Sequence, residues 1–535
     1  MPYLDAYQGS WTEKEIRHLL RRTTYGATQS MVSECLGLGL QSTIDKLFED
    51  LPEAQPPLKY QFDGNGRDQV NDPDADYGET WVNGDPVPNV GSNQEQARII
   101  NARKRSLYAW SFLQMTTSHI NIREKLTHFW HNHFVAVNQN PHIEYYYYKL
   151  IQSQALGNFI QLTKDMTINP NMLLYLSGAL NSKFAPNENY SRELLELFTV
   201  GKGVDVGQGD YTNYTEDDVV EMAKALTGWR VQNAVSGTFI PNRHTEGTKT
   251  LSHRFNNAEL AENGEDEYKD LIDLIFQQDE CSRFITRQLY KWFVKDVIDA
   301  DIETNIIEPL AKIIRENNYE IVPALKVLFA SQHFYENVFC MVKSPIDLIM
   351  SGTKSLLLSN PTTSVKDAYE YAYVLYLVCN ELEQGLFNHP DVAGWKAYYQ
   401  EPLFYKTWIN NYLLPKRMDY CKVLVTGGSM SIDNVTFDIP PLIPVFSFIA
   451  DINNSIDPNV LIRELANRMF NYPISDAQLE NLKEILIPGL PDFEWTVEYG
   501  DYLNNPGDNA LRISVENKLR NLIGTMVQMS EFQIM

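Results

Sequence analysis

Cysteine is scarce in this chain, and the few cysteines stand far apart. Five are spread over 535 residues, and no two form a CxxC pair. Zinc ribbons and dense disulfide frameworks require closely spaced pairs of cysteines. Neither kind of site is therefore predicted.

Long apolar runs are also missing. No stretch approaches the roughly 18 consecutive apolar residues of a transmembrane helix, and the best candidate, PLIPVFSFIA, is short and contains two prolines. The start of the chain, MPYLDAYQGSWTEKEIRHLLRR, lacks an apolar segment of signal-peptide length. We therefore expect no transmembrane segment and a cytoplasmic location.

Basic residues are fewer than acidic residues. Lysine and arginine number 45 against 69 acidic residues, which gives a formal net charge of -24. A surface this acidic repels phosphate backbones, so a nucleic-acid partner is not expected. The chain also lacks a GxSxG elbow, a P-loop and a dinucleotide fingerprint, so serine-hydrolase and nucleotide chemistry are not predicted.

Helical periodicity dominates what is present. Thr12 with Glu15, and Thr215 before EDDVVEMAKALTGW, show the spacing of helix N-caps. Further helical patterns cover 94–134, 265–298, 303–331, 343–358, 363–380, 456–470, 475–487 and 508–528. Strand patterns are limited to WRVQNAVSGTFIP and a weaker patch near 420–440. The predicted fold is mainly α: a multi-helix orthogonal bundle with a small β-hairpin and long Gly/Asp/Pro-rich loop insertions.

The length exceeds that of one ordinary core, so we predict two units. Residues 1–415 form the main helical domain, with a loop insertion at about 51–93. Residues 416–535 form a C-terminal subdomain, a short β patch followed by helices, packed on the main domain.

The loop insertion carries acidic residues at nearly alternating positions, a pattern that supplies oxygen ligands to calcium. These residues are Asp72, Asp74, Asp76 and Glu79. The loop lacks the glycine spacing of an EF-hand, and Pro73 interrupts it. A solvated surface loop is the favoured interpretation.

Three of the ten histidines lie in HFWHNHF, residues 128–134. If the segment is helical throughout, Glu124, His128 and His131 share one face and His133 points elsewhere. If the helix ends near Asn132, His131 and His133 converge. A metal site, a polar site without metal and a buried core segment all remain open.

Two other segments are dense in polar groups. In APNENYSRELLELFTVG, Glu193 and Glu196 are helical neighbours, and Arg192 is spaced to reach Glu196. A surface helix with an internal ion pair explains that pattern equally well. In FIPNRHTEGTKT, His244 and Lys249 flank a glycine on a predicted loop, where site residues often lie.

Ten segments together resemble one bacterial family, the domain-of-unknown-function 1800 family. In chain order they are HLLRRTTYGAT, FWHNHF, APNENYSRELLELFTVG, YTEDDVVEMAKALTGW, RHTEGTKT, FITRQLYKWFV, KSPIDLIM, GLFNHPDVAGW, TWINNYLL and MVQMSEFQIM. The resemblance runs from about residue 16 to the last residue.

The resemblance implies a helical protein, and family members are commonly exported. It also implies a partner, a sulfatase-like protein of the domain-of-unknown-function 1501 family, whose genes often lie nearby. The motif positions that it assigns here are His131, Asn132, His133, Asn187, Asn189, Arg192, Glu193, Glu196, Trp229, His244, Gly247 and Lys249. The chain departs from the family pattern at Phe198, where many members have histidine, and at His389, where proline is common.

One hypothesis unites these residues in a metal-dependent enzyme, a hydrolase or oxidase with a His/Glu site between helices. His131, His133 and His244, with Glu193, would bind zinc, iron, copper or manganese. Arg192 and Lys249 would orient an anionic substrate group. Without metal, Glu193 and His133 would act as an acid/base pair and Lys249 would stabilise negative charge.

The rival hypothesis is a non-catalytic helical scaffold that binds a polysaccharide or a protein partner. It expects exposed tyrosines, including the run Tyr145 to Tyr148, although a run at this helical spacing is more often a half-buried face than a sugar platform. In that case the motif residues form a buried polar network that fixes helix packing.

Overall fold

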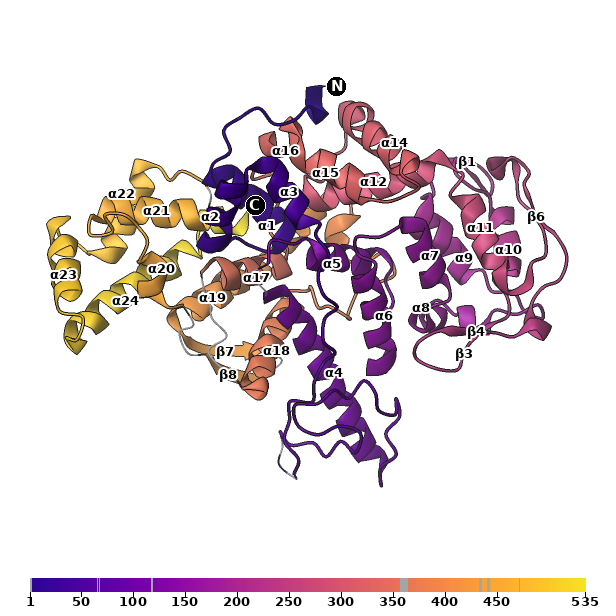
Figure 1. Ribbon diagram of the computed structural model, residues 1–535, viewed down its shortest axis with the longest axis horizontal. Coiled ribbons are helices and arrows are strands. Elements are labelled where there is room, and N and C mark those ends of the chain that lie inside the picture. Colours follow the sequence, from indigo (N-terminus) through magenta and orange to yellow (C-terminus); the bar gives the residue numbers. More distant parts are fainter. Residues whose placement is uncertain are drawn as a thin grey trace.

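The prediction of a mainly α fold is confirmed by the computed structural model, which describes residues 2–64, 66, 68–116, 119–356, 364–432, 435–439, 443–470 and 472–535. The chain forms helices joined by short turns, with small two-stranded sheets at the periphery (Figure 1). Within the described ranges, no helix combines the length and apolarity needed to cross a membrane.

The first half of the chain is built mainly of α-helices. They are α1 (Glu13–Thr24), α2 (Gln29–Leu38), α3 (Leu40–Leu47), α4 (Asn93–Thr116), α5 (Arg123–His133), α6 (Pro141–Ser153), α7 (Phe159–Thr167), α8 (Pro170–Tyr175), α9 (Asn189–Glu193) and α10 (Glu216–Ala225). A π-helix, η3 (Leu194–Thr199), continues directly from α9.

The second half continues with further helices. They are α11 (Glu267–Ile275), α12 (Asp279–Phe293), α13 (Ala300–Ile302), the π-helix η7 (Glu303–Ile307), α14 (Glu308–Glu316), α15 (Val322–Ala330), α16 (Gln332–Glu336), α17 (Pro345–Ser355), α18 (Val365–Glu381), α19 (Leu413–Thr426), α20 (Val445–Ile449), α21 (Pro458–Phe470), α22 (Asp476–Leu486), α23 (Phe493–Asn504) and α24 (Asn509–Met526).

All the strand pairs are antiparallel. The strands are β1 (Asp205–Gly207) with β2 (Asp210–Tyr211), β3 (Trp229–Val231) with β4 (Gly237–Phe239), β5 (Lys249–Thr250) with β6 (Glu259–Leu260), and β7 (Gly428–Ile432) with β8 (Val435–Ile439). The predicted hairpin at WRVQNAVSGTFIP is β3–β4, and the weaker β patch is β7–β8. Positions 117–118, 357–358, 363, 433–434 and 440, which our predicted helices and strands included, lie outside the described residues.

The predicted helix starts are confirmed. Thr12 and Thr215 both make reciprocal capping boxes, with Glu15 and Asp218 respectively. The caps satisfy backbone N–H groups that the first helical turn leaves without a partner. The stretch 94–134 forms two helices, α4 and α5.

Helix α5 lies in the centre of the molecule, between α1 and α6 (Figure 1). It is buried on nearly every side, because residues 125–131 and His133 all belong to the core. A helix buried all round has no solvent face. Every histidine of HFWHNHF is therefore directed into the protein.

The tyrosine run in α6 is core, and this corrects the expectation of an exposed tyrosine surface. Tyr145, Tyr147 and Tyr148 are at most 3% exposed, and only Tyr146 is partly accessible. Helix α6 packs against α4, α5 and α8, which together cover these rings. The scaffold hypothesis cannot rest on this run.

Arg103 of α4 anchors the loop insertion at 51–93 to that helix. The Arg103 guanidinium donates to both carboxylate oxygens of Asp72, at 2.6 and 2.7 Å, and to Asp74 at 2.8 Å. Arg103 and Asp72 are both buried. These carboxylates already have a cation as partner, so Asp72 is neither solvated nor free for calcium.

The predicted division of the chain near residue 416 falls inside α19, which packs against α24 of the C-terminal part. Helices α20 to α24 gather at one end of the molecule, and β1 to β6 lie at the opposite end (Figure 1). The two-unit division stays a prediction.

Candidate functional site

Four of the motif segments meet at one small cavity, which we call the motif pocket. Its volume is about 130 Å³, and it is partly open to solvent. Its lining consists of Phe129, Asn132, His133, Glu196, Leu197, Phe284, Gln288, Lys291, Trp292, Val392, Ala393, Tyr398 and Tyr399. All except the two tyrosines belong to FWHNHF, APNENYSRELLELFTVG, FITRQLYKWFV or GLFNHPDVAGW.

His133 enters the pocket from the last residue of α5, and the π-helix η3 fixes its ring. Its Nε2 lies 3.0 Å from the carbonyl oxygen of Phe198. A carbonyl only accepts, so Nε2 carries the proton and Nδ1 keeps a lone pair. Burial lowers the pKa of His133 to about 4. The ring is therefore neutral at pH 7 and presents an acceptor.

The carboxylate of the pocket is Glu196, held by the hydroxyl of Tyr214, which donates to Oε2 at 3.0 Å. It stands on η3, and π-helical turns occur often at functional sites. Glu193, one turn earlier, is not part of the lining. Burial and the nearby charges of Glu196 and Asp391 raise the pKa of Glu193, against the effect of Arg192.

Arg192 does not make the contact that its spacing suggested. Its guanidinium donates to both carboxylate oxygens of Glu216, at 2.9 and 2.7 Å, and reaches Glu188 at 3.4 Å. Glu216 is the first residue of α10, and α10 packs against α9. This packing brings the Glu216 carboxylate within hydrogen-bonding distance of Arg192. Arg192 therefore joins two helices and does not line the pocket.

The cation of the pocket is Lys291, which we did not single out from the sequence. It comes from α12, and burial lowers the pKa of its ammonium group. Tyr399, also in the lining, donates to Asp391 Oδ2 at 3.0 Å. Lys291 stands in FITRQLYKWFV and Asp391 in GLFNHPDVAGW, so membership in those motifs is the sequence signal that could have identified both residues.

His244 and Lys249 lie elsewhere, on a buried carboxylate that the sequence analysis missed. Glu267 of α11 binds His244 Nε2 at 2.9 Å and Lys249 Nζ at 2.6 Å, and all three side chains are buried. Burial opposes the charged imidazole, but hydrogen bonds to Glu267 and the Thr227 carbonyl raise the pKa of His244. Both ring N–H groups then donate, which leaves no lone pair for a metal ion.

His131 lies on the opposite side of α5 from the pocket, with His128 and His389. The ring centroids of His131 and His389 are 4.6 Å apart. Both ring nitrogens of each are buried without a hydrogen-bond partner among the described residues. His128 Nδ1 lies 3.1 Å from the Tyr25 hydroxyl. We call His128, His131 and His389 the buried histidine cluster. As expected if HFWHNHF is helical throughout, His128 and His131 lie on one face of α5.

The predicted ligands His131, His133 and His244 therefore occupy three different environments. In the described part of the chain, no group of three or more His, Cys, Asp or Glu side chains has the arrangement of a metal site. The motif pocket instead combines a neutral imidazole, a carboxylate and an ammonium group. That set is suited to proton transfer and to the stabilisation of negative charge.

A family model described as "Protein of unknown function (DUF1800)" matches residues 18–534. No curated protein and no solved structure is significantly similar to the chain.

Proposed function

The chain belongs to the DUF1800 family, and on that premise we propose that the motif pocket is the active site of a hydrolase. One observation carries the proposal: four motif segments, distant in sequence, line a single cavity partly open to solvent, and three of them supply it with His133, Glu196 and Lys291. A cavity of about 130 Å³ holds a few water molecules, at roughly 30 Å³ each. It admits one reacting group at the end of a larger substrate.

The charge of each pocket residue determines its proposed role. Glu196 acts as the general base that activates water. His133, neutral and fixed by the Phe198 carbonyl, orients that water or the substrate through Nδ1. Lys291 stabilises the negative charge that develops on the substrate, the part first assigned to Lys249. Glu193 lies outside the lining, and its negative charge acts electrostatically on Glu196.

A metal-dependent version of this proposal keeps His133 and Glu196 as ligands. These two residues would hold the ion, since histidine and carboxylate suit zinc, iron, copper or manganese, and the ion would activate water for hydrolysis. Metal analysis of the purified protein by inductively coupled plasma mass spectrometry separates the two versions. About one transition-metal ion per chain, lost in His133→Ala, would select the metal-dependent version.

The test of the hydrolase proposal is a screen of p-nitrophenyl esters, phosphates, sulfates and glycosides, with and without added zinc or manganese. We expect turnover of at least one class, reduced about 10²-fold or more in Glu196→Gln. Glu480→Gln, at an exposed position of α22, is the matched control and should keep full turnover. No turnover in any class, or equal turnover in both variants, would contradict the proposal.

The resemblance also suggests a partner and an exported location, and both remain part of the proposal. Co-expression with a sulfatase-like protein of the domain-of-unknown-function 1501 family, followed by affinity purification of one chain, tests the partner. Recovery of both chains in equal amounts would support it. Fractionation of the producing cell tests the location.

A further inference from the structure

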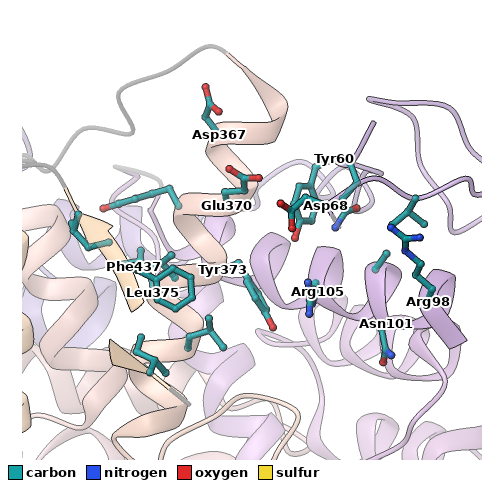
Figure 2. Close-up of a pocket in the computed structure, with 18 of the residues that line it drawn as sticks. Tyr60, Asp68, Arg98, Asn101, Arg105, Asp367, Glu370, Tyr373, Leu375 and Phe437 are labelled. Atoms are coloured by element: carbon teal, nitrogen blue, oxygen red, sulfur yellow. The ribbon is translucent and has the colours of Figure 1, made fainter. Parts of the chain in front are cut away.

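A second cavity lies between α4, α18 and the β7–β8 hairpin, and we call it the tyrosine groove (Figure 2). Its volume is about 1100 Å³, against about 130 Å³ for the motif pocket. Cavities of roughly 300–1,000 Å³ typically hold an organic ligand of drug size. The groove is therefore large enough for a ligand of several rings.

Aromatic rings backed by other rings line the groove. Tyr373 of α18 stacks on Tyr376 at a centroid distance of 5.7 Å. Tyr60 stacks on Tyr369 at 5.4 Å. Tyr373 is partly exposed, as is Phe437 of β8 across the groove, and Figure 2 shows both among the lining side chains. Tyr60 is buried, and the Arg105 guanidinium lies over the Tyr373 ring at 5.8 Å from its centroid, so the partly exposed rings of Tyr373 and Phe437 are those that a ligand can contact.

Hydrogen-bonding donors and acceptors line the same groove. Arg98, Asn101 and Arg105 project from α4, and Glu370 projects from α18 opposite (Figure 2). Donors and acceptors thus face the same space.

The charged side chains that line the groove disfavour several classes of ligand. Two guanidinium groups accompany four carboxylates, so the groove is net negative and disfavours phosphate or sulfate polymers. Two of the four carboxylates already have a partner: Glu370 lies 3.6 Å from Lys366 Nζ, and Asp438 accepts from the Ser429 hydroxyl at 2.7 Å. A cationic peptide would have to compete for them, and an amphipathic helix needs a continuous apolar stripe that the charges interrupt.

We propose that the tyrosine groove binds a neutral oligosaccharide. A sugar ring offers an apolar C–H face to Tyr373 and Phe437 and a rim of hydroxyls that both donate and accept. Those hydroxyls match the arginine, amide and carboxylate groups of the lining. The proposal rests on the groove alone and is independent of the reaction assigned to the motif pocket.

The test is affinity gel electrophoresis of the full chain through gels that contain hydroxyethylcellulose, galactomannan, glycogen or laminarin. We expect retardation by at least one of these neutral polysaccharides. Tyr373→Ala and Phe437→Ala should each weaken binding about tenfold or more, whereas Tyr373→Phe should keep most of it, since the ring remains. Phe493→Ala is the control, because Phe493 is an exposed aromatic on α23, outside the groove lining.

Thermal unfolding of each variant, measured beside the gels, separates lost binding from lost folding. Absence of retardation in all four gels overturns the proposal. So does retardation that Phe493→Ala reduces as much as Tyr373→Ala. Binding only to heparin or alginate, or only to oligolysine, would assign the groove to a charged ligand and would also overturn it.

Discussion

The backbone N–H of Trp395 donates a hydrogen bond to the side-chain oxygen of Asn132 at 3.0 Å, across 263 positions of sequence. Asn132 is the penultimate residue of α5, and Trp395 ends the motif GLFNHPDVAGW. This contact holds the segment with Val392 and Ala393 against the helix that carries His133. One wall of the motif pocket depends on it.

Gly394→Ala should disturb this contact. Gly394 has a φ of +84°, and a Cβ there would lie 2.3 Å from Asn132 Oδ1. Left-handed backbone is unfavourable for alanine, and the clash displaces Asn132. We expect a loss of roughly 1–3 kcal/mol of stability, measured by urea unfolding, and lower turnover by the motif pocket.

The matched control is Gly37→Ala in α2, where an added Cβ meets nothing within 4 Å. Alanine is a better helix former than glycine, so this variant should gain roughly 0.5–1 kcal/mol. If Gly394→Ala were as stable as the parent chain, the close approach to Asn132 would not constrain the pocket.

Glu267→Gln should destabilise the protein strongly. Glu267 is the shared partner of buried His244 and Lys249, and the substitution leaves a buried ammonium without a counter-charge. Breaking such a buried pair costs roughly 3–5 kcal/mol. Urea unfolding at pH 7 measures this loss of stability. The control is Asp266→Asn, which removes the exposed Lys269–Asp266 pair and should change the stability little.

Loss of turnover with unchanged stability in Glu267→Gln would contradict this interpretation. The cluster of Glu267, His244 and Lys249 would then be a site of chemistry, as the sequence analysis had predicted for His244 and Lys249.

Acid should weaken the fold through the buried histidine cluster. Burial lowers the pKa of His131 to about 3 and holds those of His128 and His389 well below the ordinary value of 6.5. Below pH 6.5 the unfolded chain therefore binds more protons than the folded one. Stability from these groups is present above pH 6.5 and is lost as the pH falls towards 3.

His389→Leu tests this prediction. Leucine removes two buried nitrogens that lack partners, so stability at pH 7 should stay equal or rise. The decline in unfolding midpoint between pH 7 and pH 5 should become shallower, whereas His253→Leu, at an exposed histidine, should leave the decline unchanged. A marked loss of stability at pH 7 would mean that those nitrogens bind something in the native protein.

Part of the candidate site was predictable from residue type and spacing. The motifs marked His133, Glu193 and Glu196, and the helical geometry of HFWHNHF directed His133 away from His131. Spacing did not reveal that Arg192 pairs with Glu216, 24 positions away. Nor did it reveal Lys291, because a lysine within an amphipathic helix looks the same whether it faces solvent or a cavity.

The sequence by itself determined many of the longer helices, the caps at Thr12 and Thr215 and the β3–β4 hairpin, because hydrophobic periodicity, capping residues and turn residues act over a few positions. It also determined the family, through ten motifs in order. Only the tertiary structure decided which polar groups come together: His133, Glu196 and Lys291 line one pocket, His244 and Lys249 bind Glu267, and Arg103 binds Asp72. These contacts join positions far apart in the chain, and their partners are chosen by how buried helices pack, which no local pattern encodes.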